Sequence, residues 1–89
     1  MKFTTARLCG GKALMAVSSD ELDIDMEAAV PKMVAMGHTI TQADDMMIVS
    51  QWNGMEVTTY RQGKVMYFPL EDRHACIAYA TELLEALQR

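Results

Sequence analysis

The middle of the chain alternates short apolar segments with tight-turn signals. Residues 46–52 and 55–60 are rich in β-branched, aromatic and methionine side chains, and Asn53-Gly54 separates them. Asn-Gly is a strong hairpin signal because both central residues of a type I′ turn need a positive φ. Gln62-Gly63 marks a second tight turn before residues 64–68. The pattern therefore predicts three antiparallel strands joined as a meander.

A helix is predicted after this meander. Pro69 ends the last strand because proline cannot donate a hydrogen bond to a sheet. From Asp72 onward, apolar residues recur at the period of 3.6 that is typical of one helix face. The side chains of this stripe are Cys76, Ile77, Ala80, Leu83, Leu84 and Leu87. We expect the stripe to cover one face of the sheet.

The N-terminal part predicts further strands. Residues 2–8 and 12–17 are short and partly β-favouring, and Gly10-Gly11 between them signals a two-residue hairpin turn. The second of these segments is rich in alanine, so it would also suit a helix. Residues 38–42 again have the composition of a strand.

The segment between these strands has two interpretations. Residues 21–27 alternate acidic and apolar side chains with a period of two, which favours a strand. A capping box that begins at Ser18 favours a helix instead. Pro31 helps to decide, because proline deep inside a helix costs about 3 kcal/mol. We predict a short acidic strand or extended arm, followed by a helix over residues 27–36 that Gly37 ends.

Together these elements predict an α+β fold. An antiparallel sheet of about four to six strands, with a meander in its second half, packs against the C-terminal helix, and a second short helix accompanies it. A chain of 89 residues forms one core, so we expect residues 1–89 to be a single domain. A core of this size leaves little net stability, which makes dimerisation a natural supplement.

The turn lengths predict which side chains share a face of the sheet. If both turns of the meander hold two residues, Trp52 lies opposite Met55 and Val57 lies opposite Phe68. The more apolar face then carries Ile48, Trp52, Met55, Val57, Met66 and Phe68. We assign this face to the core under the C-terminal helix. One extra residue in either turn would exchange the two faces from that point on.

The opposite face of the meander is too apolar for an idle solvent surface and too polar for a core. It carries Met47, Val49, Gln51, Glu56, Thr58, Tyr60, Val65 and Tyr67. It could be covered by the N-terminal hairpin or the first helix, by a second copy in a homodimer, or by a small molecule or protein partner. We expect a binding face formed by Met47, Val49, Thr58, Tyr60, Val65 and Tyr67. Tyr60 and Tyr67 would be its aromatic anchors.

Residues 46–89 resemble a single repeat of the TATA-binding-protein family. The resemblance rests on Gly63-Lys64 at the end of a tight turn, and on the order strand, turn, strand and long helix. It implies a curved sheet whose uncovered face is the binding surface, which here would carry Val49, Thr58, Tyr60, Val65 and Tyr67. The chain has one such repeat and no clear counterpart of the phenylalanines that the family inserts between bases. We carry over the shape and not the DNA function; two paired chains could rebuild a two-repeat saddle.

The composition narrows the range of partners. Eight Lys and Arg against 12 Asp and Glu give a net charge of −4, which repels nucleic-acid phosphates and anionic lipids. We expect neither a nucleic-acid partner nor a membrane span, because the apolar runs fall far short of about 20 residues. Without an apolar signal segment at the N-terminus, the chain is expected in the cytoplasm. Cys9 and Cys76 form no Cys-x-x-Cys motif and are expected to be reduced thiols.

The sequence shows no pattern of catalytic residues. It contains no nucleophile elbow, P-loop or dinucleotide-binding fingerprint. His74 and Cys76 would point about 200° apart on a helix, which does not suit metal chelation. We therefore expect a noncatalytic protein without a cofactor, a binding or assembly module that forms a homodimer or binds a protein partner.

The acidic segment offers a second hypothesis. Carboxylates at alternate positions of a strand converge on one face, where they could hold a weakly bound Ca²⁺ or Mg²⁺ ion. The candidate ligands are Asp20, Glu21, Asp23 and Asp25. The spacing does not fit an EF-hand loop. Counted from Asp23, the sixth position is Ala28, where such a loop needs glycine. The segment is thus either part of a divalent-cation-binding regulatory domain or a solvated acidic edge that blocks unwanted strand pairing.

Overall fold

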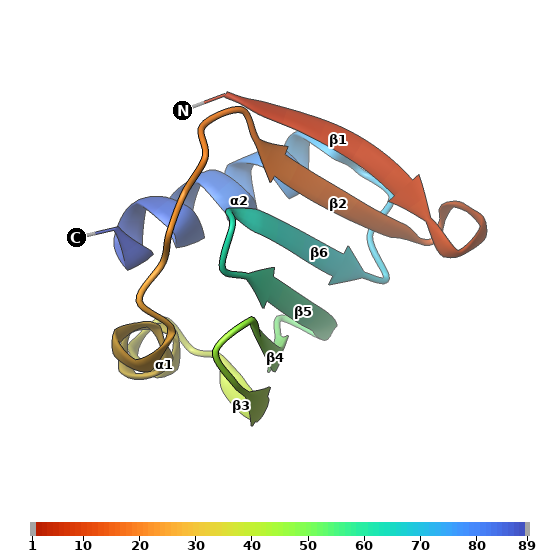
Figure 1. Ribbon diagram of the computed structural model, residues 1–89. Coiled ribbons are helices and arrows are strands. Elements are labelled where there is room, and N and C mark those ends of the chain that lie inside the picture. Colours follow the sequence, from red (N-terminus) through yellow and green to blue (C-terminus); the bar gives the residue numbers. More distant parts are fainter. Residues whose placement is uncertain (1, 89) are drawn as a thin grey trace.

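The computed structural model describes residues 2–88, apart from the side chain of Cys9, and has an α+β architecture. Within these residues, six strands form one antiparallel sheet in the order β1-β2-β6-β5-β4-β3 (Figure 1). The strands are β1 (Phe3–Leu8), β2 (Ala13–Ser18), β3 (Thr39–Ala43), β4 (Met47–Trp52), β5 (Met55–Tyr60) and β6 (Lys64–Phe68). The helices are α1 (Met26–Ala35) and α2 (Arg73–Leu87). The predicted fold class is confirmed.

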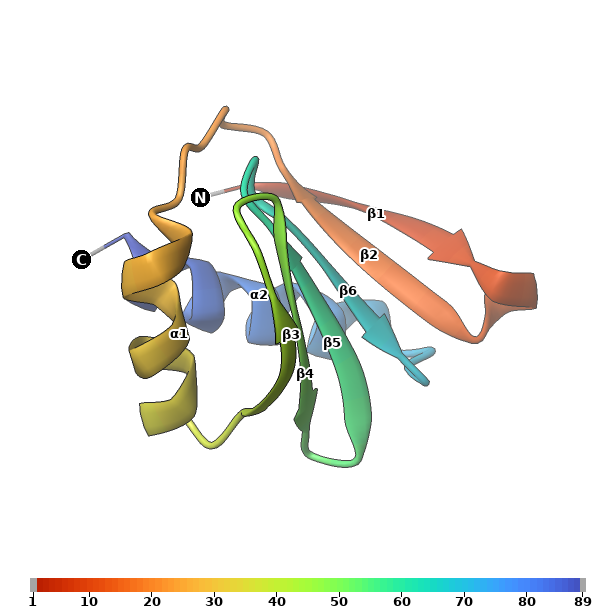
Figure 2. The ribbon, with the colours of Figure 1, turned by 60° about the horizontal axis from the view of Figure 1, so that its bottom comes forward.

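The two helices enclose one hydrophobic core against the sheet. Helix α2 lies against β1 and β2, α1 lies beside β3 and β4, and the helices contact each other (Figures 1 and 2). The core includes Leu14, Ile48, Val57, Val65 and Tyr67 from the sheet, Met26, Ala29 and Met33 from α1, and Cys76, Ala80, Leu83, Leu84 and Leu87 from α2. The predicted α2 stripe is therefore buried except at Ile77, which is 37% exposed. Neither helix has the length and apolar character needed to cross a membrane.

The β4–β5 hairpin has the predicted two-residue turn. Asn53 and Gly54 have φ angles of 55° and 78°, as a type I′ turn requires. Trp52 pairs with Met55, and the strands continue in register from there. The predicted pairing of β4 and β5 is confirmed.

The β5–β6 hairpin differs from the prediction by one residue. Its loop contains three residues, 61–63, so Tyr60 pairs with Lys64. Gly63 closes this loop with a φ of 99°, a conformation that favours glycine. Because side chains alternate between the two faces, the extra residue turns every side chain of β6 to the face opposite the one predicted. The predicted placements of Met66 and Phe68 in the core are therefore wrong.

The N-terminal hairpin extends the sheet. Strands β1 and β2 are joined through a short 3₁₀ turn (Cys9–Gly11), with Leu8 paired to Ala13, so the connection is longer than two residues. Strand β2 then pairs with β6 along residues 14–17. The interpretation that this hairpin or α1 covers the second face of the meander is wrong, because the hairpin continues the sheet sideways and α1 joins α2 in the core.

The acidic segment is an extended arm and not a strand of the sheet. Its backbone follows the β5–β6 loop, where Leu22 N–H donates to Gln62 O at 3.4 Å and Ile24 N–H donates to Arg61 O at 3.2 Å. Helix α1 then begins at Met26, one residue from its predicted start, and the Asp25 carboxylate accepts a hydrogen bond from Ala28 N–H at 3.3 Å. Of the two predicted forms of this segment, the structure has the arm.

Candidate binding face

The second face of the sheet is covered by neither helix. We define the open face as the outward side chains of β2, β6, β5 and β4 that lie opposite the helices. These are Met15, Val17, Lys64, Met66, Phe68, Glu56, Thr58, Tyr60, Met47, Val49 and Gln51. Figure 2 shows α1 at the left and α2 behind the strands.

The centre of the open face is apolar. Thr58 of the central strand β5 pairs with Val49 on one side and Met66 on the other, and Met66 pairs with Met15. These neighbours cover Thr58 so well that it is 4% exposed, while Phe68 at the margin is 38% exposed. Methionine side chains adapt their shape to a partner surface. The apolar side chains of the open face are half-buried at the centre and more exposed at Phe68, which makes this face the candidate binding surface.

Two of the six predicted binding residues do not lie on the open face. Met47, Val49, Thr58 and Tyr60 do, but Val65 and Tyr67 point into the core and are 0% and 1% exposed. Burial raises the pKa of the Tyr67 hydroxyl far above its usual range. Tyr67 therefore cannot be an aromatic anchor for a partner, and the prediction that assigned it and Val65 to the binding face is wrong.

The open face also contains residues that the sequence did not predict. Met66 and Phe68 take the places predicted for Val65 and Tyr67, and Met15 and Val17 arrive with β2. A signal for the first pair was present, because three-residue hairpin loops commonly end in a glycine with positive φ, as Gly63 does. No local signal placed β2 beside β6, because that contact joins segments about fifty residues apart in sequence.

Two charged side chains lie within the apolar surface. Glu56 is on β5 and pairs with Phe68, and Lys64 is on β6 and pairs with Tyr60. Both are exposed. Within residues 2–88, neither has an ion-pair partner, since the ion pair found there joins Arg61 to Asp23. The two charges lie on opposite sides of the Thr58–Met66 pair, each near the start of its own strand and therefore toward opposite ends of the antiparallel sheet.

A histidine and a serine meet in the core. His38 Nδ1 lies 2.8 Å from Ser50 Oγ, and the His38 ring stacks on Trp52 with centroids 5.2 Å apart. The Tyr79 ring packs edge-on against the Trp52 ring, with centroids 5.0 Å apart. His38 is 5% exposed and Ser50 0%, and burial lowers the pKa of His38. Histidine and serine can act as a general base and a nucleophile, but both side chains of this pair are buried, so a substrate cannot reach them.

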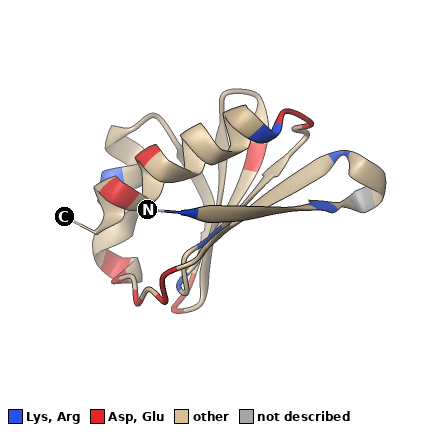
Figure 3. Ribbon diagram, turned by 90° about the horizontal axis from the view of Figure 1, so that it is seen from above, with Lys and Arg blue, Asp and Glu red and all other residues tan. Residues whose placement is uncertain are grey.

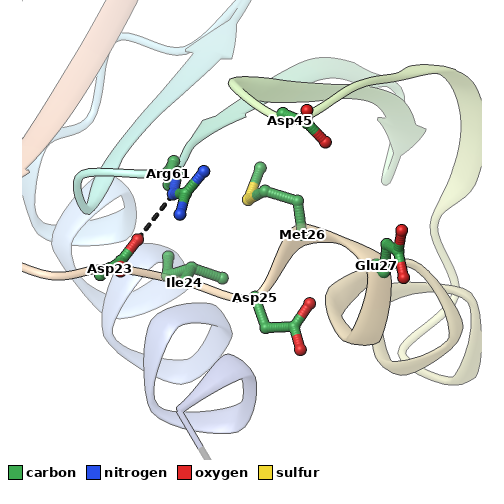
Figure 4. Close-up of a pocket in the computed structure, with 7 residues that line it drawn as sticks. All are labelled: Asp23, Ile24, Asp25, Met26, Glu27, Asp45 and Arg61. Carbon is green, nitrogen blue, oxygen red and sulfur yellow. Dashed lines mark hydrogen bonds and ion pairs between the residues drawn. The ribbon is translucent and has the colours of Figure 1, made fainter.

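The acidic arm borders a cavity of about 300 Å³ (Figure 4). It is lined by Asp23, Ile24, Asp25, Met26, Glu27, Asp45 and Arg61. Arg61 Nε donates to Asp23 Oδ1 at 2.6 Å, and this hydrogen bond raises the pKa of Arg61. Figure 4 shows Asp25 and Glu27 pointing away from this pair.

The arm does not form the predicted ligand set. The candidate ligands were Asp20, Glu21, Asp23 and Asp25. In the part of the chain that the structure describes, no three Asp, Glu, His or Cys side chains converge as a metal site would require. Asp23 is held by Arg61, and Asp25 caps α1. The arm is instead the acidic end of a molecule whose first 19 residues carry Lys2, Arg7 and Lys12 and no acid (Figure 3).

Comparison with known proteins adds no relative. The chain matches no protein-family model, and neither curated proteins nor solved structures give a match.

Proposed function

We propose that this protein is a noncatalytic assembly module that binds a protein surface through the open face. The observation that carries the proposal is a row of side chains across four neighbouring strands that neither helix covers. The row runs Met15, Met66, Thr58 and Val49, so three of its four members are apolar. Burying one such side chain against a partner contributes about 1.5–3 kcal/mol before the costs of association are subtracted.

The chemistry of the buried groups favours binding over catalysis. His38 and Ser50 are enclosed in the core. Burial also raises the pKa of the Cys76 thiol to about 11, which keeps it protonated at neutral pH. A thiol is a nucleophile as the thiolate, so Cys76 is a packing residue. His38, Ser50 and Cys76 thus serve the core, while the open face offers contact area.

The resemblance to a TATA-binding-protein repeat points to the same face. In such repeats the uncovered side of the sheet is the binding surface, and here β5, the loop that ends at Gly63, β6 and α2 follow one another in the same order. A phosphate backbone does not suit this face, because the positive charge of Lys64 is offset by Glu56 and the whole chain carries −4. We therefore propose a protein partner.

A matched pair of substitutions tests this proposal. Val49→Lys places a charge in the centre of the open face, whereas Val34→Lys makes the same change on α1, where Val34 is 54% exposed. We expect Val49→Lys to abolish self-association in light scattering and the capture of partner proteins, and Val34→Lys to leave both unchanged. Circular dichroism checks that both variants fold. If Val49→Lys associates and captures partners as the wild type does, the open face is not the binding surface.

A further inference from the structure

We infer that the partner on the open face is a second copy of this chain, packed face to face about a two-fold axis that runs across the strands at the Thr58–Met66 pair. This inference rests on the proposed function of the open face. It is carried by the positions of the two charges on that face, which make the surface complementary to itself in one arrangement.

The strand register places the charges symmetrically. Thr58 pairs with Met66, Glu56 lies two residues from this level toward one end of the sheet, and Lys64 lies two residues from it toward the other. Each charge is therefore about 7 Å from the centre along the strands, and the two strands are about 4.8 Å apart. The charges have opposite sign and equal displacement from the centre. A half-turn that reverses the strand direction therefore brings Glu56 of one copy to the level of Lys64 of the other.

A two-fold axis across the strands performs that reversal. It keeps β5 over β5 and β6 over β6 of the second copy and exchanges the two ends of the sheet. Glu56 of one copy then lies at the level of Lys64 of the other, one strand to the side. Packed sheets are about 10 Å apart, a gap that a glutamate and a lysine side chain bridge together. The symmetry produces this ion pair twice.

An axis along the strands would instead leave the charges without partners. A two-fold axis along the strands, between β5 and β6, would put Glu56 over Phe68 and Lys64 over Tyr60 of the second copy. Both charges would be covered by the second copy beside the apolar centre without gaining a counter-charge, which is unfavourable. That arrangement would bring Lys2 and Asp45 together only at the rim, where an ion pair contributes little.

The dimer would bury the apolar part of the open face at its centre. The apolar centre would consist of Met15, Val49 and Met66 from each copy, whose flexible methionines can interdigitate across the gap. The polar and charged groups would surround this centre, as in a typical interface.

A charge exchange tests the arrangement. Glu56→Lys and Lys64→Glu are each expected to weaken dimerisation by about tenfold or more, because each sets like charges against each other twice. The double variant Glu56→Lys/Lys64→Glu restores the pairs with reversed sign and is expected to recover the wild-type dissociation constant. Glu85→Lys on the exposed side of α2 is the control and should leave the constant unchanged. Sedimentation equilibrium over a concentration series measures all five proteins.

The outcomes separate this inference from the proposed function. If the double variant stays as weak as the single ones while Val49→Lys abolishes the dimer, the open face is correct and the two-fold axis is wrong. Weakening by Asp45→Lys in place of the Glu56 and Lys64 variants would favour the axis along the strands and overturn the inference. A monomeric wild type whose capture of another protein is lost in Val49→Lys would refute the second copy and keep the proposed function. A dimer that survives Val49→Lys would refute both.

Discussion

Gly63 controls the register on which the open face depends, and replacing it should be unusually costly. Its φ of 99° lies in the left-handed region, where an L-residue costs about 1–2 kcal/mol. An added Cβ would also lie 2.8 Å from Leu22 Cδ1 and 3.0 Å from Leu22 Cγ. Overpacking of this kind costs about 1–3 kcal/mol. We therefore expect Gly63→Ala to lower the free energy of unfolding by about 2–5 kcal/mol.

Two further variants separate the backbone cost from the steric cost. Gly54→Ala has the same handicap of a positive φ, 78°, but its added Cβ meets no atom within 4 Å. It should therefore show the backbone cost alone. In a Leu22→Ala background the two closest atoms are absent and the Cβ at 3.3 Å remains, so Gly63→Ala should then cost less than in the wild type and approach the cost of Gly54→Ala.

Urea unfolding followed by fluorescence measures these free energies. Trp52 is the single tryptophan of the chain and packs against His38 and Tyr79, so its emission reports on the core. The reasoning is refuted if Gly63→Ala costs no more than Gly54→Ala. It is also refuted if removal of the Leu22 side chain leaves the cost of Gly63→Ala unchanged, because Leu22 would then not be the obstacle.

Two more predictions concern titration and metal binding. Burial lowers the pKa of His38 below its ordinary value of 6.5, so the unfolded chain takes up the proton first and stability should fall as the pH drops below 6.5. Urea unfolding between about pH 7 and pH 5 should show this slope, up to about 1.4 kcal/mol per pH unit. His38→Asn should reduce the slope, and an unchanged slope in this variant would refute the assignment. Millimolar Ca²⁺ or Mg²⁺ should leave the amide NMR shifts of residues 20–27 unchanged, because Asp23 and Asp25 are already engaged by Arg61 and α1; a localised, saturable shift there would restore the cation-binding hypothesis.

The elements that the sequence predicted well have strong local causes. Asn53-Gly54 adopts the φ angles of a type I′ turn, and this local preference was enough to predict the pairing of β4 with β5. The apolar period of residues 73–87 likewise predicted α2, because a helix face is a local pattern. Helix α1 was predicted to within one residue at each end from Pro31 and Gly37. The resemblance to a TATA-binding-protein repeat stays a prediction.

The parts that the sequence could not predict depend on contacts between distant segments. The arm around Leu22 lies extended because it hydrogen-bonds to the β5–β6 loop, about forty residues away in sequence. Its alternation of acidic and apolar residues has the period of a strand, but only Leu22 and Ile24 need burial, and they pack beside the loop and the core. The place of β2 next to β6 is equally nonlocal. A hydrophobic pattern along the chain cannot distinguish a strand of the sheet from an extended arm that runs beside a distant loop.

One loop residue links the fold to the proposed function. With a two-residue loop, Lys64 would pair with Arg61, and the side chains of β6 would turn over, placing Tyr67 on the open face and Met66 in the core. Lys64 would then lie on the helix side, and the symmetric placement of Glu56 and Lys64 about Thr58 would not exist. The three-residue loop is closed by Gly63, against which Leu22 packs. It therefore sets the register that places Met66 at the centre of the open face and Glu56 and Lys64 on either side of it. A variant that unfolds this loop should lose dimerisation together with stability, whereas the charge variants on the open face should lose dimerisation alone.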